Sequence, residues 1–426
     1  MLIYSPHNTP RLRYIIDYFN EKLGLNAVVT DDEQLYKAHL SEKINYSSAG
    51  IADDELFIQS VGLLQEDEIK KHKLECFEWN NTTAFFQTND DAGFDIFSAV
   101  FYCISRYEEY LEYEPDEYGR FAHWNSLAWK NDFLMKPVVD VWLKEFGKLL
   151  QSKFPAFTLH PTPYTFIPTY DIDIAWSYKN KGFWRSIAAS IKQPSTIAER
   201  LEVVRGKKQD PFDCYDWLKQ LHQTHQLSPI YFFLVAEERG ELDRNISPKQ
   251  KALQQLIVQT KQLADVGLHP SVHSNTAKEC LAKEKNTLQQ IIRQPVAKSR
   301  HHYLQLHVPH SYRELIAAGI TDDYTMGYGT VNGFRASTSN SFLWYDLEKE
   351  KTTALRIHPF AFMEANSFYE VKQSAEEALT ELRHLFEEVK KVNGTFITIF
   401  HNHFLGTDPM FSGWKEMYEE FVAAAQ

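Results

Sequence analysis

The chain has few cysteines and no segment suited to a membrane. It contains four cysteines in 426 residues, and none of them forms a CxxC pair: Cys76, Cys103, Cys214 and Cys280. This spacing argues against a disulfide framework or a thiolate zinc site and favours isolated buried thiols. No stretch reaches the roughly 18 uninterrupted apolar residues of a membrane span. We therefore expect a protein without a membrane span.

A secretion signal and an excess of basic charge are also lacking. The first residues, MLIYSPHNTPRLRYIIDYF, do not contain a basic segment followed by an apolar one, so we expect a cytoplasmic protein. The formal net charge is -12. Nucleic acids bind mainly to basic surfaces, and this charge therefore argues against a nucleic-acid partner.

What the chain does have is enough length for more than one core. With 426 residues, 43% of them hydrophobic and 24% charged, it has the composition of a soluble globular protein of two domains. Prolines are dense between Pro155 and Pro168, and they suit a linker because they break helices. We place the domain boundary there, giving residues 1–155 and 156–426.

The first domain has the pattern of a small α/β unit without a catalytic motif. Strands are predicted at Leu2 to Tyr4 and Leu25 to Val29, on either side of a helix that begins at Pro10. Further helices are predicted within Phe94 to Tyr113 and Pro137 to Leu150.

The second domain alternates strands with helices, which predicts a mainly parallel sheet or barrel. The helical patterns include Lys249 to Asp265 and Ser374 to Val392. The predicted strands are Tyr164 to Tyr170, Pro229 to Val235, Val266 to His269, Val296 to Arg300, Gly319 to Asp322, Ala354 to Ile357 and Thr395 to Phe400. In such folds reactive side chains gather at the carboxyl ends of the strands.

One basic stretch, Tyr178 to Lys208, interrupts this alternation. Its apolar residues share one helical face: Phe183, Trp184, Ile187 and Ile191. A membrane-surface helix has this pattern, but an insertion packed on the sheet is the favoured interpretation.

Two acidic residues follow the first strand of this domain. Asp171 and Asp173 are two apart in TYDID, so an extended backbone places both carboxylates on the same side. Such neighbours repel each other unless a cation lies between them or one is protonated. Two solvated carboxylates that cap a helix are the alternative.

Two histidines follow a later strand, at His269 and His273 in HPSVH. One helical turn would place both imidazoles on one side, a spacing that suits zinc or another divalent metal. With one aspartate they make a set of three ligands that leaves a coordination position open. The second aspartate is then free to take a proton from water.

Further candidates lie at two other strand ends. His401, in IFHNH, could protonate a leaving amine, with His403 as its rival. Arg300, in SRHHY, could orient Asp171. The histidines around it offer a competing metal cluster: His301, His302, His307 and His310.

Weaker candidates complete the list. Arg335, in GFRAS, could meet a polar substrate, although a structural arginine is the favoured interpretation. Trp176, Tyr324 and Tyr328 follow strand ends and could stack on sugar rings or pack in the core.

From about Pro161 onward, the chain resembles the polysaccharide deacetylase family. Its motifs TYDID, HPSVH, SRHHY and IFHNH are similar to those of the family and follow one another in the same order. This family is the NodB-homology domain of carbohydrate esterase family four. The resemblance implies a distorted (β/α) barrel of seven strands. It implies that Asp171 is the general base, that Arg300 supports it and that His401 is the general acid. It also implies that Asp173, His269 and His273 bind a metal, commonly zinc.

We therefore predict a metal-dependent hydrolase that removes an acyl group, most simply N-acetyl, from a carbohydrate amide. Two alternatives stay open on the sequence alone. One is a small-molecule amidohydrolase on the same fold, and the other is a carbohydrate-binding relative that has lost turnover.

Overall fold

The computed structural model describes residues 1–159, 163–180, 197–238, 240–275 and 277–425. In these parts it contains a four-stranded sheet, a nine-stranded sheet and a two-stranded ribbon. The amphipathic face predicted between Tyr178 and Lys208 falls on residues 181–196, which lie outside the described residues.

The N-terminal region is built on a parallel sheet in the order β2-β1-β3-β4. Its first helix, α1, begins at Pro10 after the cap Thr9, and it ends at Gly24, whose φ of 67° favours glycine. The elements are β1 (Leu2–Tyr4), α1 (Pro10–Leu23), β2 (Val28–Thr30), α2 (Glu33–Ala38), β3 (Lys43–Ser47), β4 (Leu56–Gln59), β5 (Phe77–Trp79), β6 (Thr82–Ala84), α3 (Ile96–Ile104), α4 (Leu127–Lys130) and α5 (Val138–Lys153).

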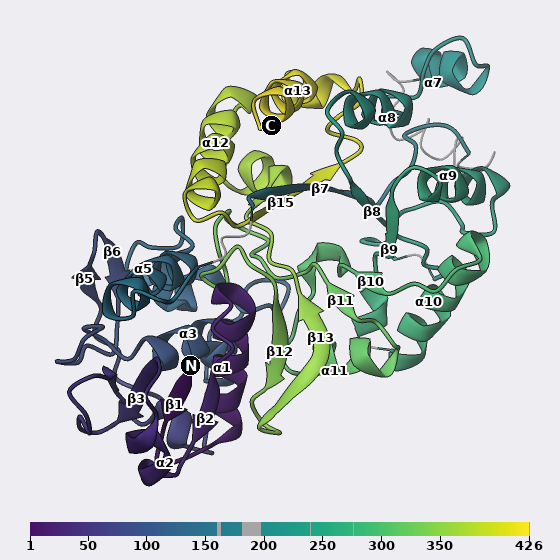
Figure 1. The fold of residues 1–426 in the computed structure, drawn as a ribbon. Coiled ribbons are helices and arrows are strands. Elements are labelled where there is room, and N and C mark those ends of the chain that lie inside the picture. Colours follow the sequence, from purple (N-terminus) through teal and green to yellow (C-terminus); the bar gives the residue numbers. More distant parts are fainter. Residues whose placement is uncertain (160–162, 181–196, 239, 276, 426) are drawn as a thin grey trace.

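The larger sheet has the order β12-β13-β11-β10-β9-β8-β7-β15-β14, and only β12 runs antiparallel to its neighbour. Helices cover its outer side (Figure 1). The strands are β7 (Thr165–Ile172), β8 (Ile230–Phe233), β9 (Asp265–Leu268), β10 (Lys298–Ser299), β11 (Asp322–Asp323), β12 (Phe342–Asp346), β13 (Lys351–Ile357), β14 (Phe362–Met363) and β15 (Thr395–His401). The helices are α7 (Ile197–Val204), α8 (Tyr215–Thr224), α9 (Lys251–Lys261), α10 (Lys278–Ile292), α11 (His310–Ala317), α12 (Ala375–Lys391) and α13 (Trp414–Ala424).

The mainly parallel α/β sheet agrees with the prediction, but the distorted barrel of seven strands is not confirmed, because the nine described strands of this sheet leave two free edges at β12 and β14. The N-terminal region covers the first edge: the hydroxyl of Tyr14 in α1 donates to the Leu343 carbonyl at 2.7 Å. Isolated backbone hydrogen bonds link the connection between β13 and β14 to the segment that follows β11, as from Phe360 N to Met326 O and from Gly333 N to Ala361 O.

Side chains on the two faces of the sheet enter different clusters. On β8, Ile230 and Phe232 pack on the inner side with Ile397 and Ile399, in a cluster separate from the main core. Tyr231 points the other way, into the core that the helices share. The sheet therefore curves around an apolar interior, and polar groups gather where its strands end.

The two regions share one hydrophobic core and are joined by buried ion pairs. Glu109 of the N-terminal region binds Arg335 through two hydrogen bonds, of 2.9 and 2.7 Å, and also accepts one from Arg106. Burial by itself raises the pKa of Glu109, but the charges of the two arginines lower it overall. Arg335, which the sequence offered as a candidate for substrate contact, thus belongs to the buried contact between the two regions.

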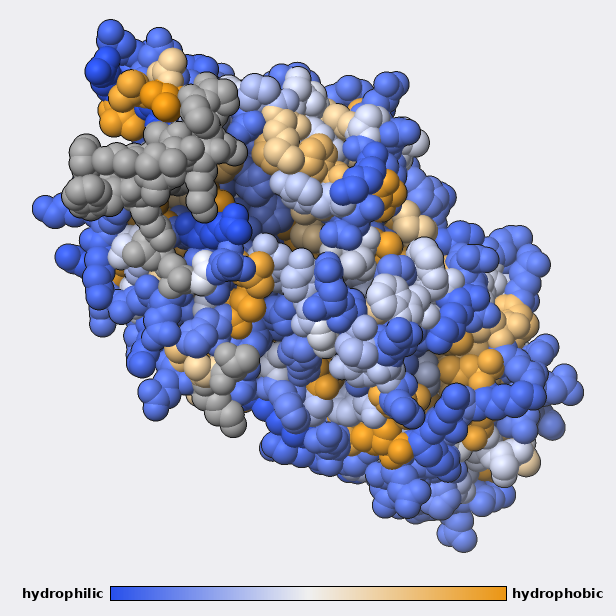
Figure 2. All heavy atoms as spheres, turned by 180° about the vertical axis from the view of Figure 1, so that it is seen from behind, coloured by the Kyte–Doolittle hydropathy of each residue, from blue (hydrophilic) through white to orange (hydrophobic). Residues whose placement is uncertain are grey.

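No helix in the described parts of the chain is long and apolar enough to cross a membrane. On the face opposite to that of Figure 1, hydrophilic side chains dominate and hydrophobic ones form separate patches (Figure 2). The four cysteines are free thiols; Cys103 and Cys214 are buried as predicted, whereas Cys76 and Cys280 are only partly buried.

We predict that Glu109→Gln destabilises the whole chain, because it leaves the buried guanidinium of Arg335 without its carboxylate and leaves Arg106 with that of Glu108 alone. The expected loss in the free energy of unfolding is about 3–5 kcal/mol. Urea unfolding followed by circular dichroism measures it. Glu75→Gln is the matched control, since Glu75 pairs with Lys73 at an exposed site, and it should leave the transition unchanged. Equal midpoints for wild type and Glu109→Gln would show that this ion pair does not hold the regions together.

Candidate metal site

The carboxyl ends of β7, β9, β10 and β15 bring together five of the six residues predicted from the sequence. Asp171 on β7 lies in register with His401 on β15, and Asp173 follows two residues later. Four of these side chains line one cavity of about 360 Å³, namely Asp171, Asp173, His269 and His401, while Arg300 lies buried behind it.

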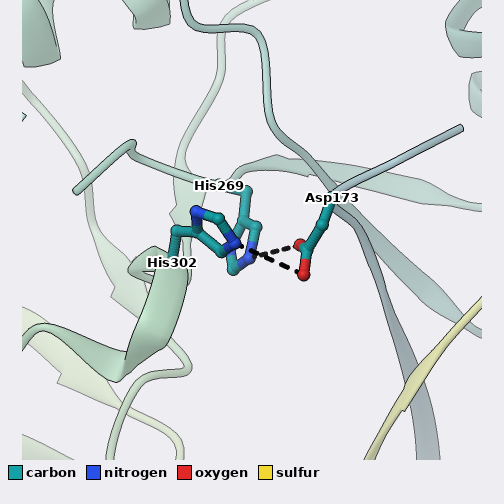
Figure 3. A group of neighbouring side chains, drawn as sticks. All are labelled: Asp173, His269 and His302. Atoms are coloured by element: carbon teal, nitrogen blue, oxygen red, sulfur yellow. Dashed lines mark ion pairs between the residues drawn. The ribbon is translucent and has the colours of Figure 1, made fainter. Parts of the chain in front are cut away.

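Asp173, His269 and His302 form the candidate metal site. Oδ1 of Asp173 lies 3.0 Å from Nε2 of His269, and its Oδ2 lies 3.3 Å from Nε2 of His302. The three side chains point toward one another from separate segments (Figure 3). One ligand atom from each lies within 4.8 Å of the others, which is close enough for a shared ion.

The tautomer of His269 shows why a cation fits here. Its Nδ1 lies 2.5 Å from the carbonyl of Arg300, and a carbonyl can only accept, so Nδ1 carries the hydrogen. Nε2 of the neutral ring then has only a lone pair, facing a carboxylate oxygen. Within the described residues neither Nε2 nor Asp173 Oδ1 has a hydrogen-bond partner. Two such acceptors repel each other unless a positive charge, from a proton or a metal ion, lies between them.

His302 is oriented by a second carboxylate. Its Nδ1 lies 2.8 Å from Asp243 Oδ1, and the backbone N–H groups of Val272 and His273 donate to Asp243 in turn. Burial lowers the pKa of His302, but Asp173 and Asp243 raise it to about 9. A carboxylate behind an imidazole is the usual support of a histidine that binds a metal through Nε2.

His273 does not join this site, contrary to the prediction. The N–H of His269 donates to Phe233 O, so His269 continues the extended strand, and the following Pro270 disfavours a helical backbone at this position. The helical spacing therefore does not apply. His273 begins the 3₁₀ turn η5 (His273–Asn275), and its Nε2 lies 3.1 Å from Glu238 at a half-exposed position.

Arg300 holds Asp171 from behind, as the sequence suggested. Its Nη1 donates to Asp171 Oδ1 at 2.9 Å and to Thr169 Oγ1 at 2.7 Å. The guanidinium lies over the ring of Phe232, 4.5 Å from its centroid. The other oxygen of Asp171, Oδ2, lies 3.7 Å from His269 Nε2. Asp171 thus has one fixed oxygen and one next to the candidate metal site.

His401 and His403 differ sharply in their surroundings. Nδ1 of His401 lies 2.7 Å from the fully buried Glu364, and its Nε2 lies 3.4 Å from Asp173 Oδ2. Burial opposes the charged ring, but Glu364 and Asp173 raise the pKa of His401 to about 10. Burial lowers the pKa of His403 to about 3. His401 therefore carries a transferable proton near neutral pH, and His403 does not.

The N-terminal region supplies part of the cavity wall, through Tyr118 and Arg120. Arg120 donates from Nε to Asp116 at 2.7 Å and from Nη1 to the Tyr303 carbonyl at 2.6 Å. Tyr303 has a φ of 56° and follows His302 directly. Arg120 also fills the space beside Gly329, where a Cβ would lie 2.1 Å from Nη1. The segment that carries His302 thus rests on the N-terminal region.

Other candidate residues from the sequence lie in the hydrophobic core or outside the candidate metal site. Trp176, Tyr324 and Tyr328 are buried in the two hydrophobic clusters. His307 contacts Gln305 at 3.3 Å, and neither His307 nor His310 belongs to a potential metal-binding group within the described residues. Of the competing histidine cluster, His302 joins the candidate metal site and His301 lines the cavity, and the sequence carries no signal that ranks His302 above its neighbours.

The comparisons with known proteins differ between the two regions. Residues 1–155 match the model of a family of unknown function, DUF7033. No curated protein matches the chain in sequence.

Three solved structures that are similar to the chain each align with 62% of it. A Mycobacterium smegmatis protein described as a polysaccharide deacetylase is 12% identical with a TM-score of 0.40, over 85% of its own length. The Puue allantoinase is 8% identical with a TM-score of 0.40, over 84% of its length. The polysaccharide deacetylase Bc1974 from Bacillus cereus is 8% identical with a TM-score of 0.32, over 88% of its length.

We predict that His302→Ala weakens zinc binding while His307→Ala, the matched control, leaves it nearly unchanged, because His307 belongs to no potential metal-binding group within the described residues. Loss of a group that only supports a ligand costs about 10–100-fold in affinity, so loss of a ligand should cost at least as much. Competition with a chromophoric chelator measures both dissociation constants. The ligand set drawn from the geometry is wrong if His307→Ala releases the metal and His302→Ala retains it.

Proposed function

We propose that the chain is a metal-dependent hydrolase that removes the acyl group from an N-acetylated saccharide. The observation that supports this most is the contact between His269 Nε2 and Asp173 Oδ1, two acceptors that face each other at 3.0 Å beside an open cavity. Two imidazoles and one carboxylate, from His269, His302 and Asp173, suit zinc and leave a coordination position free. When bound in such a site, a divalent cation acidifies water and polarises a carbonyl group.

Asp171 is the proposed general base. Arg300 holds its Oδ1, so that Oδ2 is the oxygen available at the cavity. As a water molecule adds to the acyl carbon, Asp171 takes the proton that the water loses. The contact with Arg300 fixes the orientation of the carboxylate, which keeps the proton acceptor in one place during the reaction.

His401 is the proposed general acid. Glu364 fixes its Nδ1, so Nε2 is the ring atom nearer the candidate metal site. Its proton passes to the amide nitrogen as the C–N bond breaks, and the products are a carboxylic acid and a free amine. We assign this role to His401 rather than to His403, since among these two only His401 has a carboxylate that orients it.

An N-acetylated sugar is the substrate class that we propose. A cavity of about 360 Å³ is in the range of small-ligand sites, and its lining combines aromatic rings with hydrogen-bonding groups. Tyr118, Tyr303 and Tyr369 supply rings that can contact the apolar face of a sugar. The carboxylates and histidines beneath them lie where the acetamido group would enter.

We expect the purified protein to release acetate from oligomers of N-acetylglucosamine. Chelation with EDTA should abolish the release, and added Zn²⁺ should restore it, because the cation is required for activation of water. Enzymatic assay of acetate measures both steps. Hydrolysis of a ureide or formamide alone would favour the small-molecule amidohydrolase. Tight binding of zinc without hydrolysis of any acylated amine would favour the non-catalytic relative and contradict the proposal.

We also predict that Asp171→Asn lowers kcat at least 100-fold and leaves the zinc content unchanged. Positioned general bases contribute about 10²–10⁴-fold to rates, and Asp171 is not one of the three proposed ligands. Steady-state assays and metal analysis of the same preparation test this. Asp322→Asn is the matched control, because Asp322 contacts His358 away from the cavity and should keep the wild-type rate. An Asp171→Asn protein with full activity would exclude Asp171 as the base.

A further inference from the structure

A segment of the N-terminal region runs from the cavity to the surface. Tyr118 and Arg120 line the cavity, and Gly329 lines it from the opposite chain segment. Next to Gly329, the hydroxyl of Thr330 lies 2.9 Å from Nδ1 of His123. The chain from residue 118 to residue 130 thus starts at the cavity and stays in contact with its rim three residues after Arg120.

Two tryptophans lie just beyond this contact. Trp124 belongs to the 3₁₀ turn η3 (His123–Asn125) and Trp129 to helix α4, and they are 38% and 46% exposed. Both rings contact the ring of His123 edge to face, with centroid distances of 5.1 and 4.4 Å. Within the described residues no side-chain hydrogen bond is formed by either indole, and the backbone N–H of Trp129 donates to Ser126. The rings of His123, Trp124 and Trp129 form an aromatic patch whose outer side is exposed to solvent.

The surroundings of this patch favour a sugar over a protein partner. Residues next to it are polar or charged, including Glu114, Asn125 and Lys130, and a protein interface would need a much larger apolar core. A sugar ring needs only one half-exposed aromatic face for its C–H groups and nearby donors and acceptors for its hydroxyls. The indole N–H groups can donate and the exposed carboxylate of Glu114 can accept, whereas the amide of Asn125 is already bonded to Glu114 and Ala122.

We propose that residues 118–130 form a binding surface for the sugar units that extend from the acylated unit in the cavity. This inference rests on the proposed function and adds to it a binding surface in the N-terminal region. It gives the N-terminal region a role in substrate binding, with Trp129 as the main contact and Trp124 as the second.

The test compares substrates of two lengths. With the N-acetylglucosamine hexamer, Trp129→Ala should lower kcat/KM about tenfold, the effect of losing one aromatic contact. With the dimer, the same variant should match the wild type, and Trp129→Phe should recover most of the activity on the hexamer. Trp217→Ala is the control, since Trp217 lies in α8 against Lys415, outside the cavity lining and the patch. Thermal melting checks that each variant is folded.

Other results would overturn the inference. An equal loss on dimer and hexamer would point to a general disturbance of the cavity, and no loss on the hexamer would show that the patch does not bind the chain. If no acetylated sugar is hydrolysed, the proposed function fails, but calorimetric titration of the hexamer into wild type and Trp129→Ala still decides the binding question. Weaker binding by the variant would support the patch, and equal or absent binding would contradict it.

Discussion

The hydrogen bond from Nδ1 of His269 to the carbonyl of Arg300 is the constraint on which the site depends. It fixes a hydrogen on Nδ1 and leaves Nε2 facing Asp173 Oδ1 at 3.0 Å. The side chain of Arg300 at the same time holds Asp171. Arg300, the residue directly after β10, therefore sets both the tautomer of a candidate metal ligand and the orientation of the candidate base. Arg300 is fully buried and its guanidinium lies over the ring of Phe232. Its contacts with His269 and Asp171 are therefore fixed in position.

The sequence was informative wherever a strand led directly into a reactive residue. A strand that ends in a polar side chain fixes the position of that side chain, and the pairing of β7 with β15 puts Asp171 opposite His401. The prediction that His273 binds the metal with His269 was wrong, because it assumed a helical backbone where the chain is extended at His269. His302 could not be ranked above its neighbours from sequence alone. Its selection depends on Asp243, a residue 59 positions away that only the fold brings within 2.8 Å.

The sequence also could not show that the larger sheet is open. Strand patterns reveal which segments are extended, but closure depends on what meets the edge strands. Here α1 of the N-terminal region occupies the outside of β12, through Tyr14 and through an ion pair between Arg11 and Glu350. Two-residue strands such as β14 are too short to produce a periodic signal. The edge at β12 is thus protected by another part of the chain rather than by pairing with β14, which also keeps it from pairing with other molecules.

These contacts bear on why residues 1–155 accompany the larger sheet at all. Glu109 and Asp140 reach across to Arg335 and to the loop at Thr338, and both carboxylates are buried. Arg120 supports the carbonyl of Tyr303, whose left-handed backbone follows His302. A buried guanidinium that loses its carboxylate is costly, so the larger sheet without its N-terminal partner would expose Arg335 and leave the turn at Tyr303 unsupported. The region is therefore part of the framework that positions the site, and a separate module attached to a self-sufficient hydrolase would not need these contacts.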